Sequence, residues 1–378
     1  MTLGSRVRLC LKDLYQQDIV EMVERETRRY EIESIEHPDH PDFERAYKIL
    51  WGAFGPQGEM EPEHAIRKFL LDDSYEPLPS GTFIRYFLLV AKDRDGNLRG
   101  VRDGSVIYNP AWAPDLCTIY LGHIYLLPDA RGTVLTYWLR IAPVELAVEY
   151  LAQLQLRGLI NLPLPDQPGK YFGVQLNMAA EIEFFSPEDR LSLQRILFYG
   201  RGGFDVIDPR HFPYQQPDFH EPETIAAVGN RPVPFMLLLR RMGREREARL
   251  PIAEASTIMR LLYDEFAYFC TPDFLQNSLD IVQTRLAERR AQGRPDVALL
   301  PLPTGANNLQ RLKRLFRYDN FRRYYPDVAG QDEYIERIRQ KLAANPRWFD
   351  DEVAALAVLL AKTRRYVYSS RNPGPVTP

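Results

Sequence analysis

Residues 171–185 carry polar side chains that are suited to acid–base chemistry. Apolar and polar side chains alternate along this segment, which is typical of a β-strand with one face of each kind. The polar face consists of Gln175, Asn177, Glu181 and Glu183. A carboxylate at Glu181 or Glu183 can accept a proton from an ammonium group or bind a cation. A solvated face is the alternative, but we expect helices over both faces of this sheet and therefore interpret the polar face as the lining of a cleft.

The segment that follows residue 116 has an arrangement suited to an anion. Residues 117–127 are rich in β-branched, aromatic and aliphatic side chains and predict a buried strand, and residues 128–132 predict a turn. Thr133 then predicts the N-cap of a long helix. The first turn of that helix presents free backbone N–H groups and the positive end of the helix dipole, which together suit a phosphate. Arg131 can neutralise the charge of such a phosphate.

Two further side chains could transfer a proton. Tyr199 lies at the end of a helical pattern over 187–199, and a phenol with a pKa of about 10 is protonated at neutral pH and can donate its proton. An aromatic ring that packs the helix end against the sheet is the alternative. His123 lies in the middle of the strand over 117–127, where a hydrogen-bonded core histidine is the alternative to a catalytic base.

Two clusters have simpler interpretations. The turn over 37–42 holds two histidines and two aspartates that could bind a metal, but its two prolines favour a solvated loop, and we expect no metal. In 309–325, six basic and five aromatic residues meet one acidic residue, a mixture that also occurs in proteins that bind single-stranded nucleic acid. The net charge of −3 favours an amphipathic helix with solvated arginines, so we expect no nucleic-acid partner.

The elements that position these residues predict a mixed α/β fold followed by helices. The other expected strands are 28–35, 83–92, 98–108, 204–207 and 233–241. The other expected helices are 43–54 and 62–72, and long proline-rich loops are expected over 159–170 and 208–231. From about residue 252 the pattern is wholly helical, over roughly 253–269, 272–292, 305–325, 331–344 and 347–368. We therefore predict an N-terminal helix over 1–27, an α/β domain over 28–250, an all-α domain over 251–370 and a disordered tail over 371–378.

The composition indicates neither a membrane protein nor a secreted one. Three cysteines without metal-type or redox-pair spacing suggest reduced thiols. The N-terminus carries charges where a signal peptide needs an apolar run, and the apolar run over 354–361 is too short to span a bilayer. We expect a cytoplasmic protein without a membrane partner, and the sequence leaves its oligomeric state open.

The order of the expected elements over 28–241, together with two local motifs, resembles the GNAT N-acyltransferase superfamily. In LLPDARGTVLTYWL, Arg131 and Gly132 match the family's pyrophosphate loop, Gln/Arg-x-x-Gly-x-Gly/Ala, whereas Val134 and Thr136 stand where glycine or alanine is expected. In LFYGRGGFDVID, Tyr199 begins a match to the family pattern Tyr-x-x-x-Gly-Phe. The helices after residue 252 match no family.

The resemblance implies an enzyme that moves an acetyl or other acyl group from acyl-CoA to an amine by direct attack. It implies Tyr199 as the general acid for the leaving thiolate, and from the polar face of the strand we expect Glu181 to take the ammonium proton. The residues implied to bind CoA are Leu126, Leu127, Arg131, Gly132, Thr133 and Val134. For the acceptor, a small-molecule or peptide amine, we expect binding by Gln175, Asn177, Glu183, His123 and Tyr214.

A second interpretation is a protein of the same fold that no longer uses CoA and acts as a binding or scaffold module. The bulk of Val134 and Thr136 at the phosphate loop favours it. The Tyr199 motif and the polar face that carries Glu181 favour the enzyme.

Overall fold

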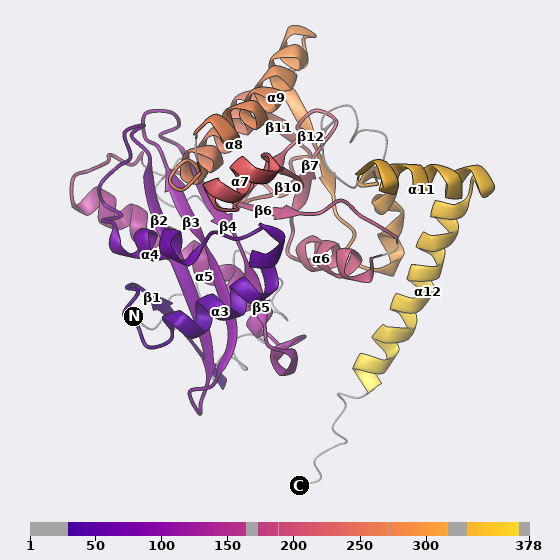
Figure 1. The fold of residues 1–378 in the computed structure, drawn as a ribbon, viewed down its shortest axis with the longest axis horizontal. Helices are drawn as coiled ribbons and strands as arrows, with labels where there is room; N and C mark the ends of the chain where they lie inside the picture. Colours follow the sequence, from indigo (N-terminus) through magenta and orange to yellow (C-terminus); the bar gives the residue numbers. More distant parts are fainter. Residues whose placement is uncertain (1–28, 164–172, 188, 271, 317–330, 370–378) are drawn as a thin grey trace.

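The computed structural model describes residues 29–163, 173–187, 189–270, 272–316 and 331–369. In this part of the chain, ten strands form one mixed sheet and two short strands pair separately (Figure 1). The sheet contains β1 (Tyr30–Ile35), β2 (Phe83–Asp93), β3 (Leu98–Tyr108), β4 (Leu116–Leu121), β5 (Ile124–Leu126), β6 (Gln175–Ile182), β7 (Asp205–Ile207), β10 (Met236–Arg241), β11 (Arg249–Pro251) and β12 (Asp296–Pro301). The short pair is β8 (Gln215–Gln216) and β9 (Val233–Pro234).

Helices cover both faces of this sheet. They are α3 (Phe43–Phe54), α4 (Glu63–Leu71), α5 (Leu135–Leu156), α6 (Arg190–Arg201), α7 (Pro222–Val228), α8 (Ile252–Phe266), α9 (Pro272–Ala291), α11 (Gln331–Ala344) and α12 (Trp348–Ser369). Three 3-10 helices are η2 (Gly55–Gln57), η3 (Pro128–Ala130) and η4 (Ala306–Arg314). α5 packs on one face of the sheet, whereas α3, α4 and α8 pack on the other (Figure 1). Among the described helices, none is long and apolar enough to cross a membrane.

The strand order is β1-β2-β3-β4-β6-β10-β7-β12-β11. Neighbours are antiparallel from β1 to β4 and again from β6 onward, whereas β4 and β6 are parallel. Apart from the division of one expected strand into β4 and β5 and the addition of β8, α7 and β9, the order of elements over 28–241 is the one that the resemblance to the GNAT superfamily implies. The mixed α/β fold class and the GNAT-like order of its elements are therefore confirmed.

The alternation of side chains along β6 separates the two cores of the molecule. Leu176, Met178 and Ile182 belong to the core that contains α5. Asn177 points to the other face, where its amide donates a hydrogen bond of 3.3 Å to Glu254 of α8. Because successive side chains of a strand point to opposite faces, alternate residues of β6 pack against α5 and α8.

The parallel strands β4 and β6 part near the middle of the sheet. Their pairing ends at Leu121 and Ala180. Beyond this point β5, the continuation of β4, pairs with β3, while β6 runs on to Ile182. The strand expected over 117–127 is therefore two strands. In open α/β sheets, ligands bind at the carboxyl ends of parallel strands where neighbouring connections diverge, so this parting marks the region to search for a site.

The expectation of a wholly helical chain after residue 252 is wrong at one place. β12 pairs antiparallel with β7 and β11, so the sheet continues into this part of the chain. The helices α8, α9, α11 and α12 form as expected. β12 is a short run between helical patterns, and its partner β7 lies far away in the sequence, so periodicity alone gives no sign of the pairing. The boundary near residue 250 stays a prediction.

Smaller differences follow from local geometry. The loop expected over 208–231 contains β8 and α7, and the helix expected over 305–325 begins as the 3-10 helix η4. The helix expected within 1–27 and the expected tail lie outside the described residues, as do parts of 159–170 and 305–325.

Candidate active site

Glu181 lies on β6 directly beyond the last residue pair between β4 and β6. The Tyr120 hydroxyl donates a 2.6 Å hydrogen bond to Glu181 Oε2, and the Gln216 amide donates one of 3.1 Å to the same oxygen. The Tyr214 hydroxyl donates to Oε1. Burial raises the pKa of Glu181 to about 7, although these hydrogen bonds favour the charged form. A carboxylate that titrates near neutrality and has ordered partners can act as a general base.

His123 follows β4 and is held as a cation. Its Nδ1 lies 3.0 Å from Asp103 Oδ1, and its Nε2 lies 2.8 Å from the Glu59 carbonyl oxygen. Both partners are acceptors, so both ring nitrogens carry protons. Burial by itself lowers the pKa of His123, but the Asp103 carboxylate and the neighbouring Glu61 raise it to about 10. His123 is therefore a fixed positive charge at neutral pH and not a general base there.

Four carboxyl groups gather around this pair, and we call them the acidic cluster: Glu59, Glu61, Glu181 and Glu265. Burial raises the pKa of Glu61 to about 7. The pKa of Glu265 lies well above its usual range because the side chain is buried, although the Ser105 hydroxyl donates a 2.5 Å hydrogen bond to it. The negative charge of Glu181 raises the pKa of Glu61 further, and the charges of Glu61 and Glu181 raise that of Glu265. Because Asp103 already balances His123, the acidic cluster favours a cationic ligand.

Tyr199 approaches the parting from the other face of the sheet. It lies in the last turn of α6, where its ring packs edge-on against Phe204 with ring centroids 5.2 Å apart. Its hydroxyl group is a close neighbour of the Arg102 guanidinium on β3. Arg102 pairs with Ile124 of β5, which is one of the two strands that part. Tyr199 and Glu181 therefore border the same parting from opposite faces.

The turn before α5 has features that fit a phosphate. Gly132 has φ of 72°, a conformation that favours glycine. The helix begins at Leu135, one residue later than expected, and the Thr133 hydroxyl accepts a 3.3 Å hydrogen bond from the Leu135 N–H.

The side chains of this turn leave its outer surface accessible. Val134 is buried in the core that contains α5, so its bulk points away from the place of a ligand. Arg131 is exposed and lies over the Tyr125 ring, with its Nε donating to the Leu126 carbonyl oxygen. The Leu127 N–H donates to the Arg99 carbonyl oxygen, which fixes the end of β5. The residues present therefore fit the pyrophosphate of a coenzyme.

The remaining predicted acceptor residues are not all brought together. Tyr214 and His123 lie with Glu181 around the acidic cluster. Gln175 and Asn177 are buried near the opposite end of β6, six and four residues from Glu181, which at 3.3 Å per residue is about 20 and 13 Å along the strand. Glu183 is partly exposed and pairs with Arg195 of α6.

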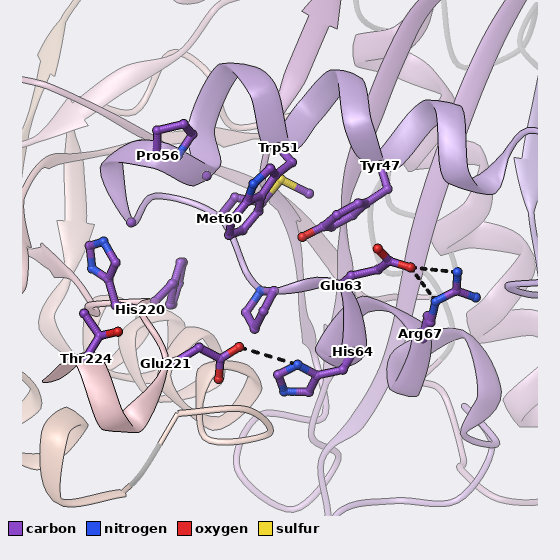
Figure 2. Close-up of a pocket in the computed structure, with 14 residues that line it drawn as sticks. Tyr47, Trp51, Pro56, Met60, Glu63, His64, Arg67, His220, Glu221 and Thr224 are labelled. Atoms are coloured by element: carbon purple, nitrogen blue, oxygen red, sulfur yellow. Dashed lines mark hydrogen bonds and ion pairs between the residues drawn. The ribbon is translucent and has the colours of Figure 1, made fainter. Parts of the chain in front are cut away.

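A hollow of about 720 Å³ opens on the other side of the segment 58–62 (Figure 2). Gly58, Met60 and Pro62 line it, whereas Glu59 and Glu61 between them belong to the acidic cluster. Figure 2 shows aromatic rings of α3 on one wall and side chains of α4 and α7 on the others. One short segment therefore separates an open hollow from the buried carboxylates.

Another group of acidic and histidine side chains lies at the edge of the sheet. Ligand atoms of Glu33, His40 and Asp42 are close enough to share an ion. The Lys92 ammonium lies 2.8 Å from Glu33 Oε2 and also contacts Asp42. Because this lysine supplies the positive charge, we interpret the group as an ion-pair network.

The sequence analysis did not identify several residues of the site, although the sequence contains an indication of two of them. Arg102 and Asp103 are adjacent charges in the middle of the strand expected over 98–108, where both sides are expected to be covered. A charged pair at such a position indicates partners on both faces of the sheet. Glu265 lies in a helical pattern like any other, and only its packing against Ser105 brings it to the site.

The sequence matches no protein-family model and no curated protein. Its structure is similar to that of spermidine N-acetyltransferase from Vibrio cholerae in complex with CoA and spermine, with 10% identity over 58% of this chain and 99% of that chain and a TM-score of 0.30. An acetyltransferase of the GNAT family from Staphylococcus aureus has 13% identity over 56% and 99%, with a TM-score of 0.27. A GNAT superfamily phosphinothricin acetyltransferase from Sinorhizobium meliloti, in complex with AcCoA, has 18% identity over 42% and 62%, with a TM-score of 0.22.

Proposed function

We propose that this protein is an N-acyltransferase that moves an acyl group from acetyl-CoA or another acyl-CoA to an amine. The observation that carries the proposal is the position of Glu181 and Tyr199 on opposite faces of the sheet at the parting of β4 and β6. One group can take a proton and the other can give one. This pair of roles is what transfer from a thioester to an ammonium compound requires.

The residues have separate tasks in this proposal. The acidic cluster binds the ammonium form of the acceptor, and Glu181 takes its proton, directly or through water. Tyr199 donates its hydroxyl proton to the departing sulfur. The coenzyme supplies the thioester, and backbone N–H groups of 130–135 with the Arg131 side chain hold its pyrophosphate.

The acceptor is a cationic amine, either a small molecule or a peptide side chain. His123 pairs with Asp103, so its charge does not balance Glu59, Glu61 and Glu181, and a bound cation would favour the charged forms of these carboxyl groups. The cluster therefore selects a cation over a neutral or anionic acceptor.

Acyl-CoA is expected to raise the melting temperature of the purified protein. A ligand at a hundredfold excess over its Kd stabilises the native state by about 2.7 kcal/mol, which corresponds to a rise of a few degrees. Arg131→Ala should reduce the rise because it removes the exposed cation of the phosphate turn. Arg157→Ala, which replaces an exposed arginine at the far end of α5, serves as the matched control. A melting curve that saturating CoA leaves unmoved would favour the scaffold interpretation instead.

The pH dependence of turnover should follow Glu181. This carboxylate must be deprotonated to accept a proton, so kcat/KM is expected to rise about tenfold per pH unit below about 7 and to level off above. His123 stays protonated over this range because its pKa is about 10. Deprotonation of the free amine also raises kcat/KM with pH, so the profile is compared with that of Glu181→Gln. An inflection near pH 7 that persists in Glu181→Gln assigns it to another group.

A further inference from the structure

Arg102 is a charged side chain enclosed in the centre of the fold. It lies in the middle of β3 and its exposed fraction is 0%. None of its three guanidinium nitrogens has a carboxylate or carbonyl acceptor among the residues that the structure describes, although the Tyr199 hydroxyl lies close enough to interact with them. A buried cation without an acceptor is costly, so the native protein is expected to supply one in its working state.

The other arginines that are fully buried in the described structure have such partners. Arg241 donates to the carbonyl oxygens of Glu247 and Arg249 and pairs with the Glu247 carboxylate. Arg140 donates to the Phe198 carbonyl oxygen at 3.1 Å. Arg102 therefore differs from these two arginines because it has no carbonyl or carboxylate acceptor among the described residues, and most of its five N–H donors remain open to a ligand.

The surroundings of Arg102 favour an anion. Burial lowers its pKa, and the nearby Arg140 guanidinium lowers it further, whereas Tyr199 and Asp103 raise it. Two guanidinium groups that lie close together in a buried site repel each other, and an anion between or beside them relieves that repulsion. A carboxylate suits the planar fork of a guanidinium best because it can accept two parallel hydrogen bonds.

The sheet decides which substrate can bring this anion. Asp103 and Ser105 point to the face that holds the acidic cluster, where they contact His123 and Glu265. Arg102 lies between them in β3 and points to the opposite face, beside Tyr199. Under the proposed function, Tyr199 marks the position of the thioester sulfur. An anion on this face therefore belongs to the acyl donor, and the cationic acceptor occupies the other face.

We propose that Arg102 binds a carboxylate at the far end of the acyl group, so that the preferred donor is a dicarboxylic acyl thioester such as succinyl-CoA. This inference rests on the proposed function. During transfer, the amine nitrogen bonds to the acyl carbon while the carbon–sulfur bond breaks. The ammonium proton goes to Glu181, the Tyr199 proton goes to the thiolate, and the carboxylate on Arg102 is unchanged. Arg102 is thus a specificity-determining residue.

The experiment compares wild type with Arg102→Met, which keeps the length of the side chain without its charge. Without ligand, Arg102→Met should melt higher than wild type because an unpartnered buried charge is gone. Without acceptor, succinyl-CoA should raise the melting temperature of wild type more than acetyl-CoA does, and the two should act equally on Arg102→Met. With acceptor, the ratio of kcat/KM for succinyl-CoA over acetyl-CoA should fall by on the order of 10²-fold in the variant.

Two further variants keep the result interpretable. Arg102→Lys retains the charge but not the fork, so its preference for succinyl-CoA should be intermediate. Arg157→Met removes an exposed arginine from α5 and should leave the preference unchanged.

Each opposing result has a distinct meaning. Equal shifts by both thioesters in wild type overturn the role of Arg102 but leave the proposed function standing. No shift by either thioester removes the proposed function and the inference together. A lower ligand-free melting temperature in both Arg102→Met and Arg102→Lys assigns Arg102 a structural partner and overturns the inference. If Arg102→Met instead lowers kcat/KM only for amines that carry a carboxylate, Arg102 binds the acceptor and the assignment to the acyl donor is wrong.

Discussion

Tyr199→Phe is expected to lower kcat by on the order of 10²-fold while the affinity for acyl-CoA stays nearly the same. Phenylalanine keeps the ring, and therefore the edge-on contact with Phe204. The variant loses only the hydroxyl group beside Arg102. Without this proton donor the sulfur must leave as a bare thiolate or take its proton from water, and both routes have higher barriers. Single-turnover kinetics with a poor leaving group should show a larger loss than kinetics with an activated thioester.

The matched control is Tyr108→Phe. Tyr108 is also a buried tyrosine, and its hydroxyl donates a 2.8 Å hydrogen bond to the Pro114 carbonyl oxygen at the far end of β3. This control should lose some stability because an acceptor is left without its donor, but its kcat should stay within a few-fold of wild type. If Tyr199→Phe turns over like Tyr108→Phe, then Tyr199 is a packing residue and not the general acid.

Glu181→Gln is expected to reduce turnover of a cationic amine by on the order of 10² to 10³-fold, because it removes both the proton acceptor and a negative charge at constant shape. The KM for the amine should rise as well, whereas the binding of acyl-CoA, measured by its effect on the melting temperature, should be unchanged. Glu36→Gln removes an exposed carboxylate at the end of β1 and is the control. Full turnover in Glu181→Gln would exclude this residue from the mechanism.

The same variant should be more stable than wild type above neutral pH. The pKa of Glu181 is raised to about 7 in the folded protein, above its value in the unfolded chain. The folded state therefore holds this proton more tightly, and stability from this group is full below about pH 4.5 and is lost as the pH rises through 7. Glutamine does not titrate, so the difference in melting temperature between Glu181→Gln and wild type should grow over this interval. If Glu181→Gln is more stable but less active than wild type, the Glu181 carboxylate lowers the stability of the folded protein and is retained for function.

The Tyr199 and Glu181 predictions separate the two faces of the site. Tyr199→Phe acts on the donor side, so its effect should depend on the leaving thiol, and Glu181→Gln acts on the acceptor side, so its effect should depend on the amine. Because the two groups do not touch in the structure as described, their losses should combine nearly additively in the double variant unless both act in one transition state. A double variant no slower than the slower single one would show that they act as a unit.

The sequence by itself determined the features of this protein that depend only on residues close together in the chain, such as strand alternation, turns and helix starts. The alternation over 171–185 predicted which side chains of β6 face α5, because a strand has a period of two whatever it pairs with. The turn over 128–132 and the start of α5 followed from turn and capping residues, although the N-cap is Val134 and not Thr133. These features gave the order of elements and the position of the phosphate turn.

Tertiary structure alone decided the charges of the site. His123 was expected to be a core histidine or a base, but the contacts with Asp103 and with the Glu59 carbonyl oxygen make it a fixed cation. Glu265 reaches the acidic cluster only because α8 packs on the sheet. Protonation depends on burial and on neighbours within a few ångströms, and these neighbours come from segments far apart in the chain.

Contacts between segments far apart in the chain also explain why β12 forms and why the surroundings of Arg102 could not be predicted. The run over 296–301 becomes a strand because β7 offers it an edge, and a pairing partner distant in the sequence leaves no mark on local periodicity. The sequence shows Arg102 as one charge in a strand, next to Asp103. Arg102 lies beside Tyr199 without a carboxylate or carbonyl acceptor among the described residues, while Asp103 has His123, and this depends on which face of β3 each side chain takes and on what covers that face.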